Sequence, residues 1–365
     1  QGLMVMGNKV LITAGGTGGH IFPAQSLTEC LVSVGYSVTF TTDKRGLQHT
    51  NNIPAGNILK ISSSSISLRN PVDLFLSGLK IFKGILQSIK LMVMWKPDVV
   101  VGFGGYPSFP ILIAAQLLRI PIIIHEQNAV LGRVNRIFAA KAKFVASGFE
   151  ELQKIPPQAN HICTGNPLRD KIIQQIPKTY KTPKEKINIL IVGGSLGAKI
   201  FSIRMPEAIA LLPEKIRKKL RVVQQTTIDC KVRALNAYND AGVDAICDTF
   251  FSDIEVHLSS AHYVVSRAGA SSISEISAMG VPSLLVPLDI AMDDHQRFNA
   301  NALVNKNAAD ILLESEFTPE NIKTILENRL NDSNWLKKAS EQSKSVSRPN
   351  SASELTNLVI SIIEN

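Results

Sequence analysis

Two short apolar segments of this chain run directly into glycines. Lys9–Thr13 leads into Gly15–His20, and Ile187–Val192 leads into Gly193–Gly197. A buried parallel strand that ends in a tight turn before a helix has this pattern. Glycine lets the backbone adopt positive φ, and the helix start offers unpaired N–H groups that favour an anion such as phosphate. The two runs therefore predict two nucleotide-binding-type α/β domains.

Size and composition narrow the function classes. A chain of 365 residues is long enough for two domains, and its net charge of +9 suits a phosphorylated substrate or an anionic lipid. Nucleic acid is disfavoured as a partner, because no Arg/Lys block is interleaved with aromatic residues. The four cysteines lack the CxxC spacing of a zinc site. No apolar run reaches the roughly 20 residues that span a bilayer, so we expect a soluble or peripheral protein.

Strands and helices alternate along both halves, which predicts right-handed crossovers and two parallel sheets. We expect one domain at 1–165 and a second at 166–349, with a final helix at about 350–365 that returns to the first. Strands are expected at Val10–Thr13, Ser37–Thr42, Val99–Val101, Ile122–His125, Lys143–Ala146, His161–Cys163, Ile187–Val192, Arg221–Gln225, Ala245–Asp248, Tyr263–Ser266 and Ser283–Pro287.

The glycines before His20 do not form a dinucleotide fingerprint, because Ile21 stands where the third glycine belongs. A second glycine loop, Gly102–Ser108, follows another strand of the same half. In an open parallel sheet, ligands bind beyond the carboxyl ends of the strands. The two loops could bind a diphosphate, or the first could be a tight turn without a ligand.

Three polar groupings are candidates for chemistry. His20 begins a helix at the mouth of the glycine loop and suits a general base, although a lone histidine is usually structural. His125–Asn128 either faces a polar ligand such as a sugar or makes local turn bonds. In the second half, Glu275 could accept hydrogen bonds from ribose hydroxyls or be a solvated helix residue. Gln296 could contact sugar hydroxyls, in a segment whose carboxylates could equally be helix caps.

These motifs occur together and in order across nearly the whole chain. The set comprises Gly15–His20 with Phe22-Pro23, Gly104–Tyr106, His125–Asn128 with Asn135, Gly165–Arg169, Gly193–Ser195, Arg267–Glu275 and His295-Gln296. It resembles the MurG family of bacterial N-acetylglucosaminyltransferases of peptidoglycan synthesis. The resemblance implies a GT-B fold, with two Rossmann-like domains facing a cleft. It also implies transfer of GlcNAc from UDP-GlcNAc to the 4-hydroxyl of the muramoyl sugar of lipid I, with inversion, to form lipid II.

The resemblance also implies residue roles. His20 is expected to be the general base, with Glu126 as the alternative. Donor-binding residues are expected at Thr17, Gly18, Gly19, Asn128, Arg169, Ser195, Phe251, Ala270, Ser271, Ser272, Ile273, Ser274, Glu275 and Gln296. Acceptor-binding residues are expected at Gly104, Gly105, Tyr106 and Asn135. We expect no obligatory metal or other cofactor, because fixed amide dipoles can stabilise the leaving UDP and no Asp-x-Asp pair follows an apolar strand.

A lipid acceptor requires contact with a membrane, which the resemblance places at the cytoplasmic face. The best candidate surface is Pro71–Lys96, where Phe75, Leu79, Phe82, Leu86 and Ile89 recur at helical spacing among Lys80, Lys83 and Lys90. Such a helix can lie on an anionic bilayer or pack against a core.

The sequence leaves rival functions open. They are another UDP-sugar enzyme of the same fold, either a lipid galactosyltransferase or a UDP-GlcNAc 2-epimerase, and a non-catalytic subunit that binds nucleotide sugars. A dinucleotide oxidoreductase is the least favoured, since the fingerprint spacing fails.

Overall fold

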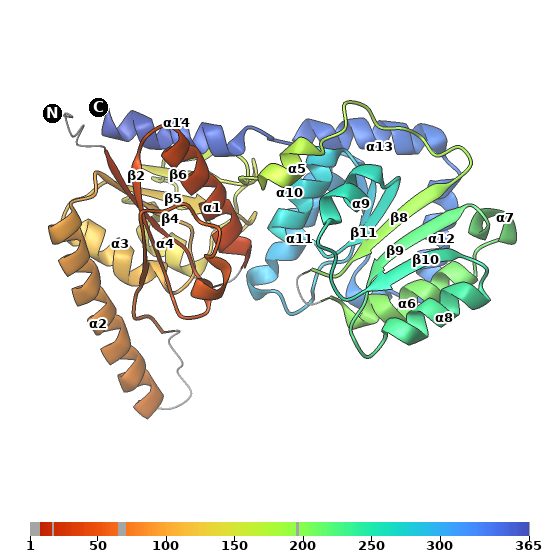
Figure 1. The fold of residues 1–365 in the computed structure, drawn as a ribbon, viewed down its shortest axis with the longest axis horizontal. Coiled ribbons are helices and arrows are strands. Elements are labelled where there is room, and N and C mark those ends of the chain that lie inside the picture. Colours follow the sequence, from red (N-terminus) through yellow and green to blue (C-terminus); the bar gives the residue numbers. More distant parts are fainter. Residues whose placement is uncertain (1–7, 17, 65–70, 195–196, 365) are drawn as a thin grey trace. The chain divides into compact units, whose positions relative to one another are not determined.

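The computed structural model describes residues 8–16, 18–64, 71–194 and 197–364, and the chain divides into two compact units (Figure 1). Unit 1 consists of Gln1–Arg169 and Arg348–Asn365, and unit 2 consists of Asp170–Ser347. Two residues expected at the site, Thr17 and Ser195, lie outside the described residues.

Unit 1 is built on a parallel sheet. Its described strands follow the order β3-β2-β1-β4-β5-β6-β7. They are β1 (Lys9–Thr13), β2 (Ser37–Thr42), β3 (Asn57–Lys60), β4 (Val99–Gly102), β5 (Ile122–Glu126), β6 (Phe144–Ser147) and β7 (His161–Cys163). The helices are α1 (Gly18–Ser33), α2 (Pro71–Trp95), α3 (Ser108–Leu117), α4 (Arg133–Ala139) and α14 (Ser351–Ile363), with a short 3-10 helix at Gly46–His49.

Both faces of this sheet are covered. Alternate residues of β1 enter different core clusters: Ile12 packs with Leu27 of α1, and Leu11 packs with residues of α3 and α4. Leu355 and Val359 of α14 join the cluster of Ile12, so the C-terminal helix completes the core of unit 1.

Residues just before unit 2 are also tied to unit 1. Asn166 Nδ2 donates to the Gln127 carbonyl at 2.9 Å, and Ser26 Oγ donates to the Leu168 carbonyl at 3.1 Å. These bonds attach residues 166 and 168 to unit 1, which extends to Arg169.

Unit 2 repeats the architecture with the described strand order β10-β9-β8-β11-β12-β13. These strands are β8 (Ile187–Val192), β9 (Leu220–Gln225), β10 (Asp244–Asp248), β11 (Tyr263–Ser266), β12 (Ser283–Leu285) and β13 (Ala309–Ile311). The helices are α5 (Asp170–Gln174), α6 (Lys199–Ala210), α7 (Glu214–Arg217), α8 (Lys231–Asp240), α9 (Ile254–Ser260), α10 (Ala270–Met279), α11 (His295–Val304), α12 (Pro319–Leu330) and α13 (Ser333–Val346), with 3-10 helices at Met292–Asp294 and Glu314–Glu316. The expected α/β class with two Rossmann-like sheets is confirmed.

Candidate functional site

Three loops of unit 1 follow neighbouring strands, β1, β4 and β5, and pack together at the carboxyl edge of the sheet. Gly15 N–H donates to the Gly104 carbonyl at 3.0 Å. Gly104 and Gly105 have φ of +86° and +79°, and a Cβ on Gly15 would lie 2.8 Å from Gly105 Cα. The first two loops therefore require glycine both for conformation and for close approach.

His20 lies in the first turn of α1, beside these loops, and is half-buried. Its Nδ1 is 2.7 Å from Gln127 Oε1. Within the described part of the chain, no hydrogen-bond partner is found for its Nε2. A ring held by one nitrogen and open at the other is suited to exchange a proton with a bound substrate.

His125 is fully buried at the end of β5, where its Nε2 is 3.0 Å from the Gly165 carbonyl. Burial lowers the pKa of His125 to about 4, so this ring is neutral at neutral pH. Gln127 Nε2 lies 3.0 Å from His125 Nδ1. His125, Glu126 and Gln127 are thus buried and bonded within unit 1, and only Asn128 of this run is partly exposed.

The carboxylate of Glu126 is 2% exposed and surrounded by N–H donors. Oε1 accepts from the Asn128 backbone N–H at 3.1 Å, and Oε2 accepts from Gly132 N–H and Asn135 Nδ2, both at 2.8 Å. Asn135, itself 2% exposed, lies against Gly104. The Glu126 carboxylate therefore joins the loop after β5 to Asn135 of α4, which lies beside the glycine loop after β4. That loop also carries the half-buried Tyr106.

The remaining candidates of unit 1 lie near the start of α1. Gly18 is half-buried and Gly19 is exposed. The guanidinium of Arg169 lies over the ring of Phe22, 5.8 Å from its centroid. This cation–π contact holds Arg169 beside the first helical turn.

In unit 2, the candidate residues gather at the carboxyl edge of β11 and β12. α10 starts four residues after β11, and its N-cap Gly269 supplies no side-chain cap. Ala270 and Ile273 are buried, and the Ile273 N–H already donates to the Gly269 carbonyl at 3.0 Å, whereas Ser271 and Ser272 are partly exposed. An uncapped helix start with small side chains is suited to bind a phosphate.

The other donor candidates of unit 2 surround this helix start. Ser274 Oγ bonds back to the Ala270 carbonyl at 2.9 Å, and Glu275 is partly exposed on α10. Gln296 Oε1 accepts from Leu288 N–H at 3.0 Å, which leaves its amide NH2 as a donor. Phe251 packs edge-on against His257, with ring centroids 5.2 Å apart.

Two features near the site were not assigned from sequence. Arg267 is 8% exposed, pairs with Glu314 at 2.8 Å and lies over the Phe201 ring, which anchors the loop before α10. Asp293 and Asp294 both adopt positive φ, 56° each, just before Gln296. These two residues form a strained turn, which the backbone geometry reveals and the sequence alone does not.

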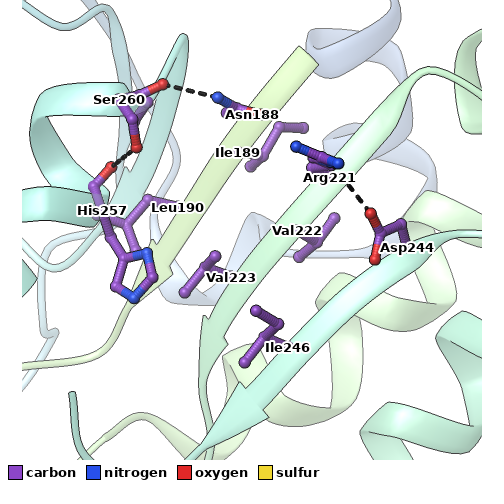
Figure 2. A pocket seen from close by; sticks show the side chains of 11 residues that line it. Asn188, Ile189, Leu190, Arg221, Val222, Val223, Asp244, Ile246, His257 and Ser260 are labelled. Atoms are coloured by element: carbon purple, nitrogen blue, oxygen red, sulfur yellow. Dashed lines mark hydrogen bonds and ion pairs between the residues drawn. The ribbon is translucent and has the colours of Figure 1, made fainter. Parts of the chain in front are cut away.

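A separate pocket of about 330 Å³ lies on the face of the unit 2 sheet (Figure 2). Leu190 of β8, Val223 of β9 and Ile246 of β10 line it at paired positions of neighbouring strands. Beside them, Arg221 forms an ion pair with Asp244 at 3.2 Å. None of the predicted site residues lines this pocket. Since parallel sheets bind ligands beyond their strand ends, we do not assign the catalytic site to it.

Among the described residues, two kinds of feature are absent. No group of three or more His, Cys, Asp or Glu residues could hold a metal ion. No helix there is long and apolar enough to cross a bilayer.

Comparison with known proteins identifies the family. Residues 10–147 match the glycosyltransferase family 28 N-terminal domain, and residues 188–355 match its C-terminal domain. Two relatives bear the name UDP-N-acetylglucosamine–N-acetylmuramyl-(pentapeptide) pyrophosphoryl-undecaprenol N-acetylglucosamine transferase. The one from Maricaulis maris is 44% identical, with 97% of this chain and 98% of the relative covered, and the one from Caulobacter vibrioides is 38% identical, with 97% and 99% covered.

A solved structure agrees with these matches. The crystal structure of Acinetobacter baumannii MurG superposes with a TM-score of 0.81 at 30% identity, covering 97% of this chain and 99% of that one. The two parallel sheets and this likeness assign the chain to the GT-B fold class expected from its sequence. The chain belongs to glycosyltransferase family 28 and, within it, to the MurG family.

Proposed function

We propose that this chain transfers GlcNAc from UDP-GlcNAc to the 4-hydroxyl of the muramoyl sugar of lipid I, forming lipid II in peptidoglycan synthesis. The observation that carries the proposal is the near-full-length identity of 44% to a transferase of that name. Two Rossmann-like units, each with loops suited to polar ligands at the carboxyl edge of its sheet, are consistent with a nucleotide-sugar donor and a diphosphate-linked acceptor.

The donor is assigned mainly to unit 2. The open start of α10, with Ser271 and Ser272, would bind the UDP diphosphate through backbone N–H groups and hydroxyls. Glu275 would accept hydrogen bonds from the ribose hydroxyls. Gln296 would donate to the sugar through its NH2, since its Oε1 already accepts from Leu288. Phe251, Arg169, Asn128 and the residues 17–19 are assigned to the donor by family resemblance.

His20 is the favoured general base over Glu126. The Glu126 carboxylate is buried and already accepts several N–H bonds, whereas His20 is half-buried with an open Nε2. In the proposed step, Nε2 takes the proton of the acceptor 4-hydroxyl as its oxygen attacks the sugar C1. The bond from C1 to the phosphate oxygen breaks, and its electron pair leaves with UDP. A single displacement of this kind inverts the configuration at C1.

The membrane surface is assigned to α2. Phe75, Leu79, Phe82 and Leu86 are each half or more exposed, with Lys80 and Lys83 exposed among them. In Figure 1 the N-terminal half of α2 extends past the other elements of unit 1. An exposed apolar helix with lysines can insert at an anionic bilayer, and its opposite side packs on α3. We assign this contact to the cytoplasmic face, where lipid I would be reached.

Vesicle binding tests the membrane assignment. The double variant Leu79→Ser, Phe82→Ser should lose most of its binding to vesicles containing anionic phospholipid, while UDP-GlcNAc affinity stays at the wild-type level. Both side chains are exposed, so the fold should be kept. Undiminished vesicle binding by a folded double variant would contradict the assignment.

Acceptor-dependent release of UDP tests the function. The chain is incubated with UDP-GlcNAc, with and without a short-chain lipid I analogue. A transferase releases UDP only when the acceptor is present, whereas a 2-epimerase of this fold would act on UDP-GlcNAc alone. A non-catalytic subunit would bind UDP-GlcNAc without release in either arm, and that result would refute the proposal.

A further inference from the structure

The side chains behind His20 form a continuous hydrogen-bonded series that its proposed role as base does not by itself explain. The series runs from the Gly165 carbonyl through His125 and Gln127 to His20, with successive distances of 3.0, 3.0 and 2.7 Å. His125 and Gln127 are at most 2% exposed. All members belong to unit 1.

The orientation of the Gln127 amide follows from acceptors that cannot donate. Gln127 Nε2 lies 3.1 Å from the His125 backbone carbonyl as well as 3.0 Å from His125 Nδ1. A carbonyl oxygen only accepts, so the NH2 group of Gln127 must face His125. The amide oxygen Oε1 then faces His20.

The proton on His20 follows in turn. Oε1 of Gln127 can only accept, so His20 Nδ1 at 2.7 Å must carry the hydrogen of this bond. In a neutral imidazole with its proton on Nδ1, the other nitrogen, Nε2, holds a lone pair. That nitrogen is the one with no hydrogen-bond partner among the described residues.

His125 locks the other end of the series. Its Nε2 faces the carbonyl of Gly165, which also accepts from Thr164 Oγ1 at 3.2 Å, so Nε2 must be the donor. Burial disfavours the charged ring, so His125 stays neutral and its Nδ1 accepts from Gln127. Two backbone carbonyls thus fix the direction of every hydrogen bond.

We propose that Gln127, oriented by the buried His125, is a positioning residue that holds His20 in the tautomer with the proton on Nδ1 and the base at Nε2. The inference deepens the proposed function and rests on the assignment of His20 as base. When Nε2 takes the proton of the acceptor hydroxyl, both ring nitrogens carry protons, and the bond from Nδ1–H to Gln127 Oε1 is retained and strengthened by the charge. No other group in the series has to lose a proton, and no hydrogen bond in it has to reverse its direction.

The resting tautomer is measured directly by ¹⁵N NMR of histidine-labelled protein, because protonated and unprotonated ring nitrogens have different chemical shifts. No substrate is present, so this result is independent of whether lipid I is turned over. We expect neutral His20 with its proton on Nδ1 in the wild type. A proton on Nε2 would overturn the proposal.

Turnover tests the consequence. Gln127→Leu should allow both tautomers of His20 and lower kcat about tenfold, the effect of one hydrogen bond, with UDP-GlcNAc affinity unchanged. Gln158→Leu, at an exposed glutamine of the same unit, is the matched control. An unchanged kcat in folded Gln127→Leu would overturn the proposal.

A pair of variants at His125 keeps the test decisive if Gln127→Leu does not fold. His125→Asn retains an acceptor atom at the position of Nδ1, whereas His125→Gln carries its polar atoms one bond further out. We expect His125→Asn to keep more of the Nδ1-protonated His20 and a several-fold higher kcat than His125→Gln. Equal loss in both would mean that His125 acts by packing alone and would overturn its positioning role.

Discussion

The two units present their candidate site residues in opposite ways. In unit 1, the buried side chains of His125 and Gln127 at the end of β5 are bonded to each other, and Gln127 is bonded to the half-buried His20 of α1. In unit 2, the start of α10 is uncapped and offers backbone N–H groups beside small hydroxyl side chains.

We propose that this difference reflects different roles of the two units, with proton transfer assigned to unit 1 and donor binding to unit 2. A buried side-chain network can fix the orientation of one proton acceptor, here His20 Nε2, as the proposed proton transfer requires. An open helix start has fixed dipoles that suit a charged phosphate, which is a requirement of binding and of leaving-group stabilisation. Substitutions in the unit 1 network should therefore lower kcat, and substitutions around α10 should weaken the donor complex.

The largest effect is expected at His20. His20→Ala removes the proposed base and should lower kcat about 1,000-fold, the middle of the range for general-base catalysis, with UDP-GlcNAc affinity retained. Steady-state kinetics and donor titration measure both quantities. The exposed His49 offers a control in His49→Ala. Loss of UDP-GlcNAc affinity without loss of kcat would contradict the proposal that unit 1 acts in proton transfer and unit 2 in donor binding.

Glu275 tests the opposite side of the comparison. Glu275→Ala should raise KM for UDP-GlcNAc about 30-fold, since hydrogen bonds to a charged group are lost, while kcat changes little. Glu341→Ala, at an exposed carboxylate of the same unit, should leave KM at the wild-type value. A fall in kcat with constant KM would contradict the donor-binding role and assign Glu275 to the chemical step.

The buried network should also make folding stability depend on pH. The pKa of His125 falls from 6.5 to about 4 on folding, so the unfolded chain binds a proton that the native chain excludes. This contribution to stability is complete above pH 6.5 and is lost as the pH falls towards 4. It amounts to about 2 kcal/mol between pH 7 and pH 5.

Urea unfolding at these two pH values measures this contribution. Burial also lowers the pKa of His161 and of His262, so the wild type has other terms of the same sign. The comparison with His125→Asn isolates the part due to His125, because the variant should lose about 2 kcal/mol less on acidification. Equal losses in the two proteins would contradict the assignment.

The smallest effect is expected from metal removal. If backbone N–H groups stabilise the leaving UDP, excess EDTA should change kcat by less than about twofold. Activity is assayed before and after chelation, with Mg²⁺ added back as a control. Loss of turnover that Mg²⁺ restores would show that the backbone dipoles of unit 2 do not suffice to stabilise the leaving UDP.

The sequence predicted most strands of both sheets, including the edge strands β7 and β10. Ser37–Thr42 and Tyr263–Ser266 match the expected strands, because β-branched runs bounded by turns are strong signals. Two strands were missed, β3 and β13. Each is three or four residues long at the edge of a sheet and mostly half-exposed, so neither carries the buried pattern that marks a strand.

The site was harder to predict, because a sequence motif does not show which side chains are buried or which way their hydrogen bonds run. His125, Glu126 and Gln127 were grouped as polar residues at a strand end, and the sequence could not tell which would be buried. Nor could it reveal the role of Gln127, because the bond from Gln127 to His20 and the bond from His125 to the Gly165 carbonyl form only in the fold.

The most direct test of the account is the configuration at C1 of the transferred sugar. UDP-GlcNAc carries an α-linked sugar, and a single displacement assisted by one base must give a β-linked product. NMR of the product formed from a short-chain lipid I analogue reads this configuration from the coupling of the anomeric proton. We expect β-linked GlcNAc on the muramoyl 4-hydroxyl, and an α-linked product would contradict a single displacement assisted by one base.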